Sequence, residues 1–166
     1  LDLIPEIAAE FETAFGRSSG GLVRGYRTED AETVVVALGS VLGTIEETVD
    51  ELREAGHRVG AVGIKTFRPW PMDEVREALG HAQRVVVVEK ALAVGIGGVV
   101  ALDVKIALQG LPAHVHSAIA GLGGRPITQA SLRGLLERAI DGELGLTTFL
   151  DLDRELVERE LARTRA

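Results

Sequence analysis

The 166-residue chain contains no cysteine, few aromatic residues and no long apolar run. Without thiolates the chain can form no disulfide, and it can supply no cysteine ligand to an iron–sulfur cluster. Aromatic residues make up only 4% of the chain, so Val, Leu, Ile and Ala must fill the core. No apolar stretch approaches the roughly 20 residues that a membrane-spanning helix needs.

The net charge and the N-terminal residues exclude further classes of protein. The net charge of −7 argues against nonspecific binding to nucleic acid. The N-terminus reads LDLIPEIAAEFE, which is acidic where a secretory signal is basic, so we expect a cytoplasmic protein without a signal peptide. Leu1 is not a translation start, so we expect a processed chain or a piece of a longer one.

Four apolar runs predict strands that are buried on both faces. They lie at residues 33–39, 58–64, 84–88 and 113–119. A segment of helical periodicity follows each run, which predicts a three-layer α/β fold with a mostly parallel sheet and helices on both faces. We expect lone helices at residues 1–17 and 150–163, and such helices usually need something to pack on.

The expected helices carry N-terminal caps and apolar faces. Thr44 and Glu47 have the spacing of a capping box, and Asp73 and Thr128 can cap later helices. The side chains predicted to face the core recur at helical intervals: Ile45, Val49 and Leu52, then Val75 and Leu79, then Val99, Leu102 and Ile106, then Leu132, Leu135, Leu136, Ala139 and Ile140.

Four loops should leave the same edge of a parallel sheet, where ligands of open α/β folds usually bind. They read GSVLGT, KTFRPWP, EKALAVGIGG and AGLGGRPIT. Lys65, Arg68 and Arg125 could hold a phosphate or carboxylate there, or be solvated surface cations. Trp70 could anchor an interface or pack into the core of this domain.

The glycine-rich loop at residues 89–98 could bind a nucleotide or could serve packing. Gly95, Gly97 and Gly98 do not complete the dinucleotide pattern G-x-G-x-x-G, because Val100 stands at the position of the third glycine. These glycines favour close helix–sheet packing, or approach by another chain, over a nucleotide cradle. The neighbouring charges at the strand end, Glu89 and Lys90, could pair with each other or with other groups.

Catalytic and metal-binding patterns are weak. His114 and His116 would share one face of a strand, but the sequence picks out no third ligand, so we expect no metal site. We find no nucleophile elbow, HExxH motif or catalytic triad. The chain therefore reads as an α/β domain without a complete active site, which would serve a larger assembly.

Several segments in order resemble one family. They are Phe15-Gly16-Arg17, YRTEDAETVVVALGSVLGTIEETVDELREAGHRVG, KTFRPWP, VVVVEKALAVGIGG and AIAGLGGRPIT. Together they are similar to the C-terminal part of the alpha subunit of pyruvate:ferredoxin oxidoreductase and related 2-oxoacid:acceptor oxidoreductases, over roughly residues 15 to 140. One departure is the pair Glu89-Lys90, where the family more often has Asp-Arg.

The resemblance implies a domain like the C-terminal domain of transketolase. Residues 1–27 would be a terminal helix and linker from a preceding pyrimidine-binding domain, residues 28–142 the α/β domain, and residues 143–166 a helical extension. The implied enzyme uses thiamine diphosphate, magnesium and iron–sulfur clusters, cleaves a 2-oxoacid oxidatively, makes an acyl-CoA and passes electrons to ferredoxin.

The resemblance places the catalytic machinery outside this chain. No catalytic, cofactor-binding or metal-binding residue of the family maps onto it, so we expect a role in assembly and active-site shaping, with other domains or subunits as partners and CoA as a further candidate. We expect no partner among nucleic acids or membranes. Two alternatives stay open: a stand-alone anion- or CoA-binding module, and the equivalent domain of a transketolase or 2-oxoacid dehydrogenase.

Overall fold

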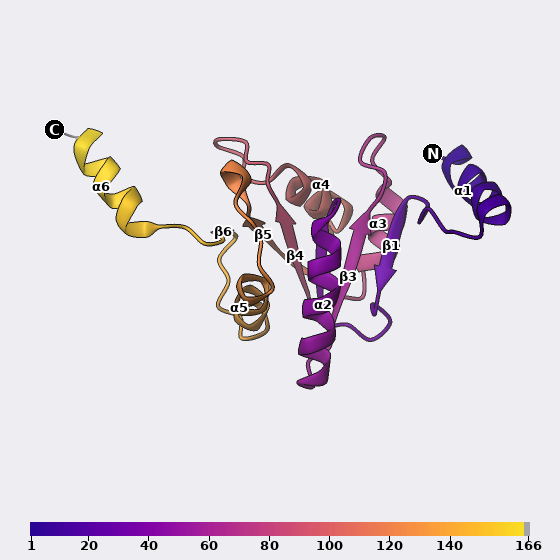
Figure 1. The fold of residues 1–166 in the computed structure, drawn as a ribbon, viewed down its shortest axis with the longest axis horizontal. Helices are drawn as coiled ribbons and strands as arrows, with labels where there is room; N and C mark the ends of the chain where they lie inside the picture. The colour runs from indigo at the N-terminus through magenta and orange to yellow at the C-terminus, as the bar shows by residue number, and fades with distance from the viewer. Residues whose placement is uncertain (165–166) are drawn as a thin grey trace.

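The structure, a computed structural model, describes residues 1–164. One six-stranded sheet lies between two layers of helices, and two further helices project from opposite ends of this body (Figure 1). The three-layer α/β architecture with a mostly parallel sheet is as the sequence predicts.

The sheet has the strand order β1-β3-β2-β4-β5-β6. All neighbours are parallel except β1, which runs antiparallel to β3. The four predicted strands are confirmed and form the centre of the sheet, whereas the two short edge strands β1 and β6 were not predicted. The strands span Val23–Tyr26 (β1), Thr33–Ala37 (β2), Val59–Ile64 (β3), Arg84–Glu89 (β4), His114–Ile119 (β5) and Thr147–Phe149 (β6).

Two helices cover each face of the sheet, and each pair closes one half of the core. Helices α2 and α5 lie in front in Figure 1, and α3 and α4 lie behind. The helices of the body span Val41–Glu54 (α2), Met72–Leu79 (α3), Val99–Ala107 (α4) and Gln129–Ile140 (α5), with a short 3₁₀ turn at Leu122–Gly124 (η1).

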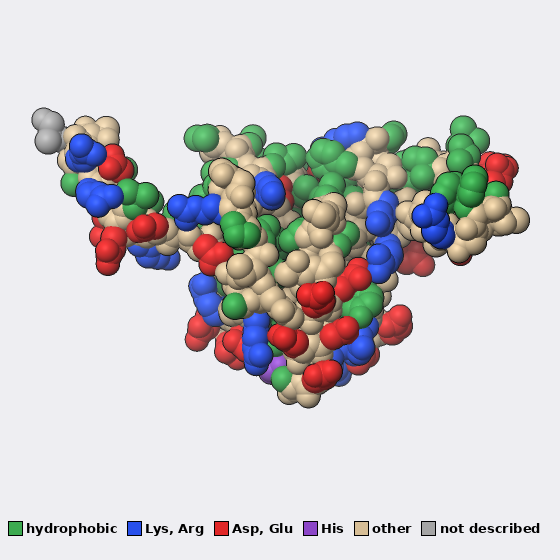
Figure 2. Space-filling view, in the orientation of Figure 1, with side chains coloured by type: hydrophobic (Ala, Val, Ile, Leu, Met, Phe, Trp, Pro, Cys, Tyr) green, Lys and Arg blue, Asp and Glu red, His purple; other side chains and the backbone are tan. Residues whose placement is uncertain are grey.

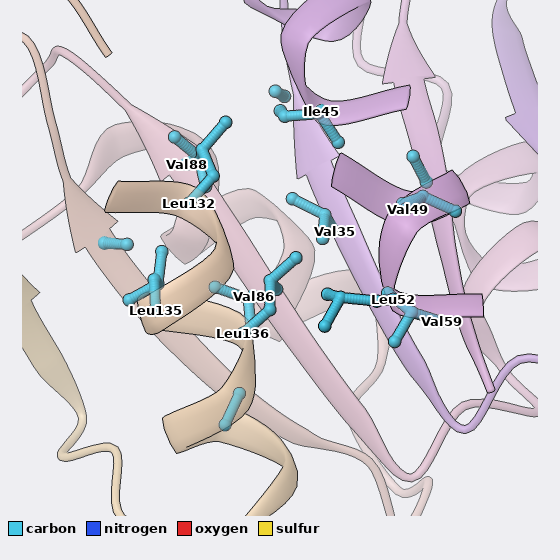
Figure 3. Close-up of a cluster of buried hydrophobic side chains, with 14 of the residues drawn as sticks. Val35, Ile45, Val49, Leu52, Val59, Val86, Val88, Leu132, Leu135 and Leu136 are labelled. Atoms are coloured by element: carbon cyan, nitrogen blue, oxygen red, sulfur yellow. The ribbon is translucent and has the colours of Figure 1, made fainter. Parts of the chain in front are cut away.

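The front half of the core interlocks aliphatic side chains from the sheet and two helices (Figure 3). Val35 and Val86 rise from the sheet and meet Ile45 and Leu52 of α2 and Leu136 of α5. These side chains are almost completely removed from water, and each contributes about 1.5–3 kcal/mol through burial. The predicted inward faces of α2, α3 and α5 are confirmed.

Two predicted helix starts are wrong. Helix α2 begins at Val41, three residues before Thr44, whose backbone oxygen accepts a hydrogen bond from the Thr48 hydroxyl. Helix α3 begins at Met72, so Asp73 lies inside the first turn and makes no capping hydrogen bond. Thr128 is a true cap of α5, because its hydroxyl accepts the Ser131 N–H at 3.1 Å.

The predicted face of α4 is also wrong. Leu102 and Ile106 are 43% and 50% exposed, and the core instead receives Val100, Ala101 and Val104. Both sides of this helix are apolar, so periodicity alone could not choose between them.

The lone terminal helices are confirmed. Helix α1 (Leu3–Phe15) and helix α6 (Arg154–Thr164) have no buried residue. Figure 1 shows them at opposite ends of the long axis, away from the body. Among the helices of residues 1–164, none combines the length and the hydrophobicity needed to cross a bilayer.

Candidate functional site at the carboxyl edge of the sheet

A cavity of about 730 Å³ opens where the direction of chain winding reverses. Strands β2 and β4 are neighbours, but α2 leads from β2 to β3 on one side, and α4 leads from β4 to β5 on the other. The loops that follow β2 and β4 therefore diverge and leave a crevice at the carboxyl ends of these two strands. Ligands of open α/β sheets usually bind in such a crevice.

Apolar and polar residues both line the cavity, and Glu89 is the one acid among them. The chain after β2 contributes the hydroxyl-bearing residues Ser40 and Thr44, and the chains after β4 and β5 contribute Lys90 and Arg125. Its apolar lining residues come from both sides of the sheet: Leu38, Val41, Val88, Ala91, Val100, Pro126 and Ile127. Such a lining suits an amphiphilic ligand or an apolar side chain of a partner.

Glu89 is a buried acid that stabilises the start of α4. Its carboxylate accepts the N–H groups of Val100 and Ala101, each at 2.9 Å. The negative charge thus sits at the positive end of the helix and satisfies two otherwise unpaired donors. Within residues 1–164, Glu89 forms these bonds and no ion pair with Lys90.

Gly98 makes room for this carboxylate. A Cβ atom at Gly98 would lie 2.1 Å from Glu89 Oε1 and 2.6 Å from Ser117 Oγ. Its backbone is extended, with φ of −68°, so the close approach and not the backbone conformation demands glycine. Ser117 is itself buried, and its hydroxyl has no hydrogen-bond partner within residues 1–164.

Gly95 and Gly97 shape the loop before α4. Both have positive φ, 84° and 95°, which glycine adopts without strain. Gly97 exchanges two backbone hydrogen bonds of 2.8 Å with Ala93, which closes a tight turn. A Cβ at Gly95 would meet nothing within 4 Å.

The four candidate cations divide into two pairs. Lys90 and Arg125 border the cavity, and Lys90 Cε and the Arg125 carbonyl both approach the open side of Gly121. Lys65 and Arg68 lie outside the cavity in the loop after β3. Arg68 forms an ion pair of 2.8 Å with Asp103 and stacks on the ring of Phe67.

Trp70 lies partly in the core. It is half-buried against the rear apolar cluster and meets the edge of the Phe67 ring, with 6.3 Å between ring centroids. Its indole N–H is buried and has no hydrogen-bond partner within residues 1–164.

Potential metal ligands do not converge in the described part of the chain. Residues 1–164 hold no cluster of three or more His, Asp or Glu side chains suited to a metal ion. His114 is exposed, and His116 contacts the Gly145 carbonyl oxygen through Nδ1 at 3.1 Å. The donor set therefore does not fit a bound metal, and without cysteine it does not fit an iron–sulfur cluster.

The shifted pKa values lie away from the cavity. A hydrogen bond from Arg53 lowers the pKa of Asp30. A hydrogen bond with Tyr26, helped by the charge of Asp50, raises the pKa of Arg27. A hydrogen bond with Glu137 likewise raises the pKa of Arg133.

Sequence comparison identifies the family. The profile of pyruvate:ferredoxin oxidoreductase core domain II matches residues 31–132, which include β2 to β5 and the cavity between them. The chain belongs to this family. Pyruvate synthase subunit PorA of Thermotoga maritima is 44% identical over 144 residues, which is 86% of this chain and 36% of that subunit. The chain thus spans little more than a third of that relative's length.

Solved structures show the same fold at lower identity. A 2-oxoglutarate:ferredoxin oxidoreductase from Magnetococcus marinus, with 2-oxoglutarate, coenzyme A and succinyl-CoA bound, superposes with a TM-score of 0.55 and 18% identity, covering 79% of this chain and 21% of that one. A split-gene transketolase, an inactive beta4 tetramer, superposes with a TM-score of 0.53 and 19% identity. That match covers 71% of this chain and 41% of the transketolase chain. Both bear out the α/β fold, and the second is itself a transketolase.

Proposed function

We propose that this chain is the C-terminal, non-catalytic domain of the alpha subunit of a thiamine-dependent 2-oxoacid (pyruvate):ferredoxin oxidoreductase. It supports subunit assembly and shapes the active site for oxidative decarboxylation to an acyl-CoA. The observation that carries the proposal is the 44% identity to a PorA subunit across 86% of the chain. In the cytoplasmic holoenzyme, other domains or subunits hold thiamine diphosphate, magnesium and the iron–sulfur clusters, and ferredoxin accepts the electrons.

The surface of the chain supports a role in assembly. Leu3, Ile7, Phe11 and Phe15 form an exposed stripe at intervals of four residues along α1. Apolar residues also remain exposed on α6 and on the carboxyl edge of the sheet. Exposed apolar surface on this scale is typical of contacts with other domains. We propose residues 1–27 and 143–166 as a linker and an extension around a domain of residues 28–142, and each of them adds one edge strand, β1 or β6, to the sheet of that domain.

Co-expression tests the assembly role. The tagged chain is produced together with the remaining polypeptides of the oxidoreductase from the same source, and the complex is analysed by gel filtration. We expect co-elution in a fixed ratio that survives a second column. Elution of the chain alone, with the other polypeptides assembled without it, would contradict the proposal.

A second candidate function is binding of CoA or a related anion at the cavity. It is favoured by one observation: Lys90 and Arg125 line the cavity beside apolar residues, and two cations suit the phosphates of such a ligand. Calorimetric titration of the chain with CoA tests it. Lys90→Ala and Arg125→Ala should each weaken binding about tenfold, whereas Lys105→Ala on α4 should not. No heat of binding for the unmodified chain would rule this candidate out.

A further inference from the structure

A cavity of about 660 Å³ lies where the N-terminal segment meets the sheet. Its lining comes from the loop that follows α1, from β1 and from the chain directly after β3: Ser18, Ser19, Gly20, Val23, Arg24, Gly25 and Lys65. None of these residues lines the cavity between β2 and β4. The two cavities are therefore separate sites.

The polar side chains of this cavity can all donate hydrogen bonds. Arg24 and Lys65 carry positive charge, and Ser18 and Ser19 carry hydroxyl groups. Among the described residues, no Asp or Glu lines this cavity. Such a set of donors fits an anion that presents several oxygen atoms.

Both cations lie against Gly20. A Cβ atom at Gly20 would lie 3.1 Å from Lys65 Cε and 3.7 Å from Arg24 Cβ. Gly20 has a positive φ of 85°, which glycine adopts without strain, so the loop can pass close over both side chains. The loop thus completes a cavity whose other wall is formed by the two cations.

The positive charge of this cavity is only partly compensated. Lys65 is exposed and forms no ion pair within residues 1–164. Arg24 pairs with Glu46 of α2 at 2.9 Å, and the two side chains are 46% and 23% exposed. Because an exposed ion pair contributes at most about 1 kcal/mol, an incoming anion can share Arg24 with Glu46.

Basic side chains gather beside this cavity, although the chain is acidic overall. Figure 2 shows Lys and Arg side chains together over β1 and the loop that leads from α1. Arg24 faces α2 in front of the sheet, whereas the acids of α3 lie behind it and those of α1 lie on the projecting helix. Asp50, a further acid of α2, is paired with Arg27. Glu46 is therefore the acid that a bound anion has to accommodate.

We propose that this cavity binds a phosphate group, either as inorganic phosphate or as the end of a phosphate monoester. The oxygens of a tetrahedral anion point in different directions, so they can accept hydrogen bonds from Lys65, Arg24 and the serine hydroxyls at once. The volume of about 660 Å³ exceeds that of a bare phosphate and leaves room for the body of a small monoester. This site goes beyond the assembly function proposed above and does not depend on it.

A bound phosphate ties the N-terminal loop to the sheet. Ser18 and Ser19 belong to the loop after α1, whereas Arg24 and Lys65 are held by the sheet through β1 and β3. An anion that contacts both sets restricts the loop and fixes the direction in which α1 leaves the body.

Calorimetric titration tests the ligand class. The chain is titrated at low salt, in buffer without phosphate, with inorganic phosphate, with glycerol 3-phosphate and with acetate. We expect both phosphate compounds to bind at least tenfold more tightly than acetate. Tighter binding of glycerol 3-phosphate than of phosphate identifies a monoester as the preferred occupant, and the reverse order identifies the free ion. If neither phosphate compound binds, or if acetate binds as tightly, the proposal is wrong.

Variants locate the bound anion. Lys65→Ala should weaken phosphate binding about tenfold, whereas Lys105→Ala, which removes an exposed cation of α4 outside the cavity, should leave it unchanged. Ser19→Asp places a carboxylate in the cavity and should also weaken binding, and the uncharged Ser19→Asn should weaken it less. Thermal unfolding confirms that each variant is folded. If Lys90→Ala or Arg125→Ala abolishes phosphate binding and Lys65→Ala does not, the anion occupies the other cavity and the proposal fails.

Limited proteolysis gives an independent readout of the loop. Trypsin cleaves after Arg17, which is exposed between α1 and the cavity. Phosphate should slow this cleavage several-fold in the wild type and should have no effect in Lys65→Ala, with the released fragment followed by mass spectrometry. Equal cleavage rates with and without phosphate in the wild type would show that no anion joins the loop to the sheet.

Discussion

Replacing Gly98 by alanine tests how the glycine-rich loop is held. The added Cβ would lie 2.1 Å from Glu89 Oε1, far inside contact distance, and 2.6 Å from the Ser117 hydroxyl. Because Glu89 and Ser117 are both buried, neither can swing into solvent without disturbing the sheet. The Glu89 carboxylate would have to move and would weaken its bonds to the N-terminus of α4.

The expected cost can be estimated from these contacts. Overpacking of a close-packed site costs about 1–3 kcal/mol. Weakening hydrogen bonds to a buried charge adds about 1.5–3 kcal/mol. Replacing glycine in an extended backbone returns about 0.4–1 kcal/mol through the unfolded state. We expect Gly98→Ala to lower the free energy of unfolding by about 3 kcal/mol, which corresponds to roughly 10 °C in Tm for a domain of this size.

Chemical denaturation followed by circular dichroism measures this difference. Gly134→Ala is the matched control, because a Cβ at Gly134 in α5 meets nothing within 4 Å. That variant should gain about 0.5–1 kcal/mol through helix propensity. If Gly98→Ala proves as stable as Gly134→Ala, Glu89 does not occupy the position described, and the account of this loop is wrong.

Three further predictions concern α4, Asp30 and Thr128. Val104→Ala should destabilise the chain by about 2 kcal/mol, whereas Leu102→Ala should change stability by less than about 0.5 kcal/mol. Urea unfolding measures both, and a larger loss for Leu102→Ala would show that the sequence-predicted face of α4 is the buried one. Asp30 has a lowered pKa through its hydrogen bond from Arg53, so its contribution is present at neutral pH and is lost as pH falls through the folded-state pKa. Asp30→Asn should therefore be less stable than wild type at pH 7 and equal to it in strong acid; a difference independent of pH would refute this. Thr128→Ala removes the N-cap of α5 and should cost about 1 kcal/mol in the same unfolding assay, and an unchanged midpoint would show that the cap is unimportant.

The centre of the fold could be predicted because its strands are buried on both faces. Val34, Val35 and Val36 are completely inaccessible, and a short run of β-branched residues favours a central strand over a buried helix. The edge strands β1 and β6 have four and three residues, are partly exposed and lack an apolar run, so the sequence offered no comparable signal.

Features set by tertiary contacts could not be predicted. Val99, Leu102 and Ile106 form an apolar stripe as good as the buried one, and the Glu89 bonds at the first turn of α4 fix which stripe faces the sheet. The cavity depends on β2 lying beside β4, and the order of strands in a sheet cannot be predicted from local sequence. The loop GSVLGT was expected at the ligand edge, but its sequence did not show that Ser40 and Thr44 would line a cavity, which depends on the reversal of winding.

Reconstitution of activity tests the central claim most directly. The remaining polypeptides of the oxidoreductase are prepared without this chain, and pyruvate- and CoA-dependent reduction of a viologen dye is measured before and after the chain is added. The assembly role predicts little activity without the chain and full recovery at one equivalent. Equal activity with and without the chain, in a complex shown to lack it, would contradict the account.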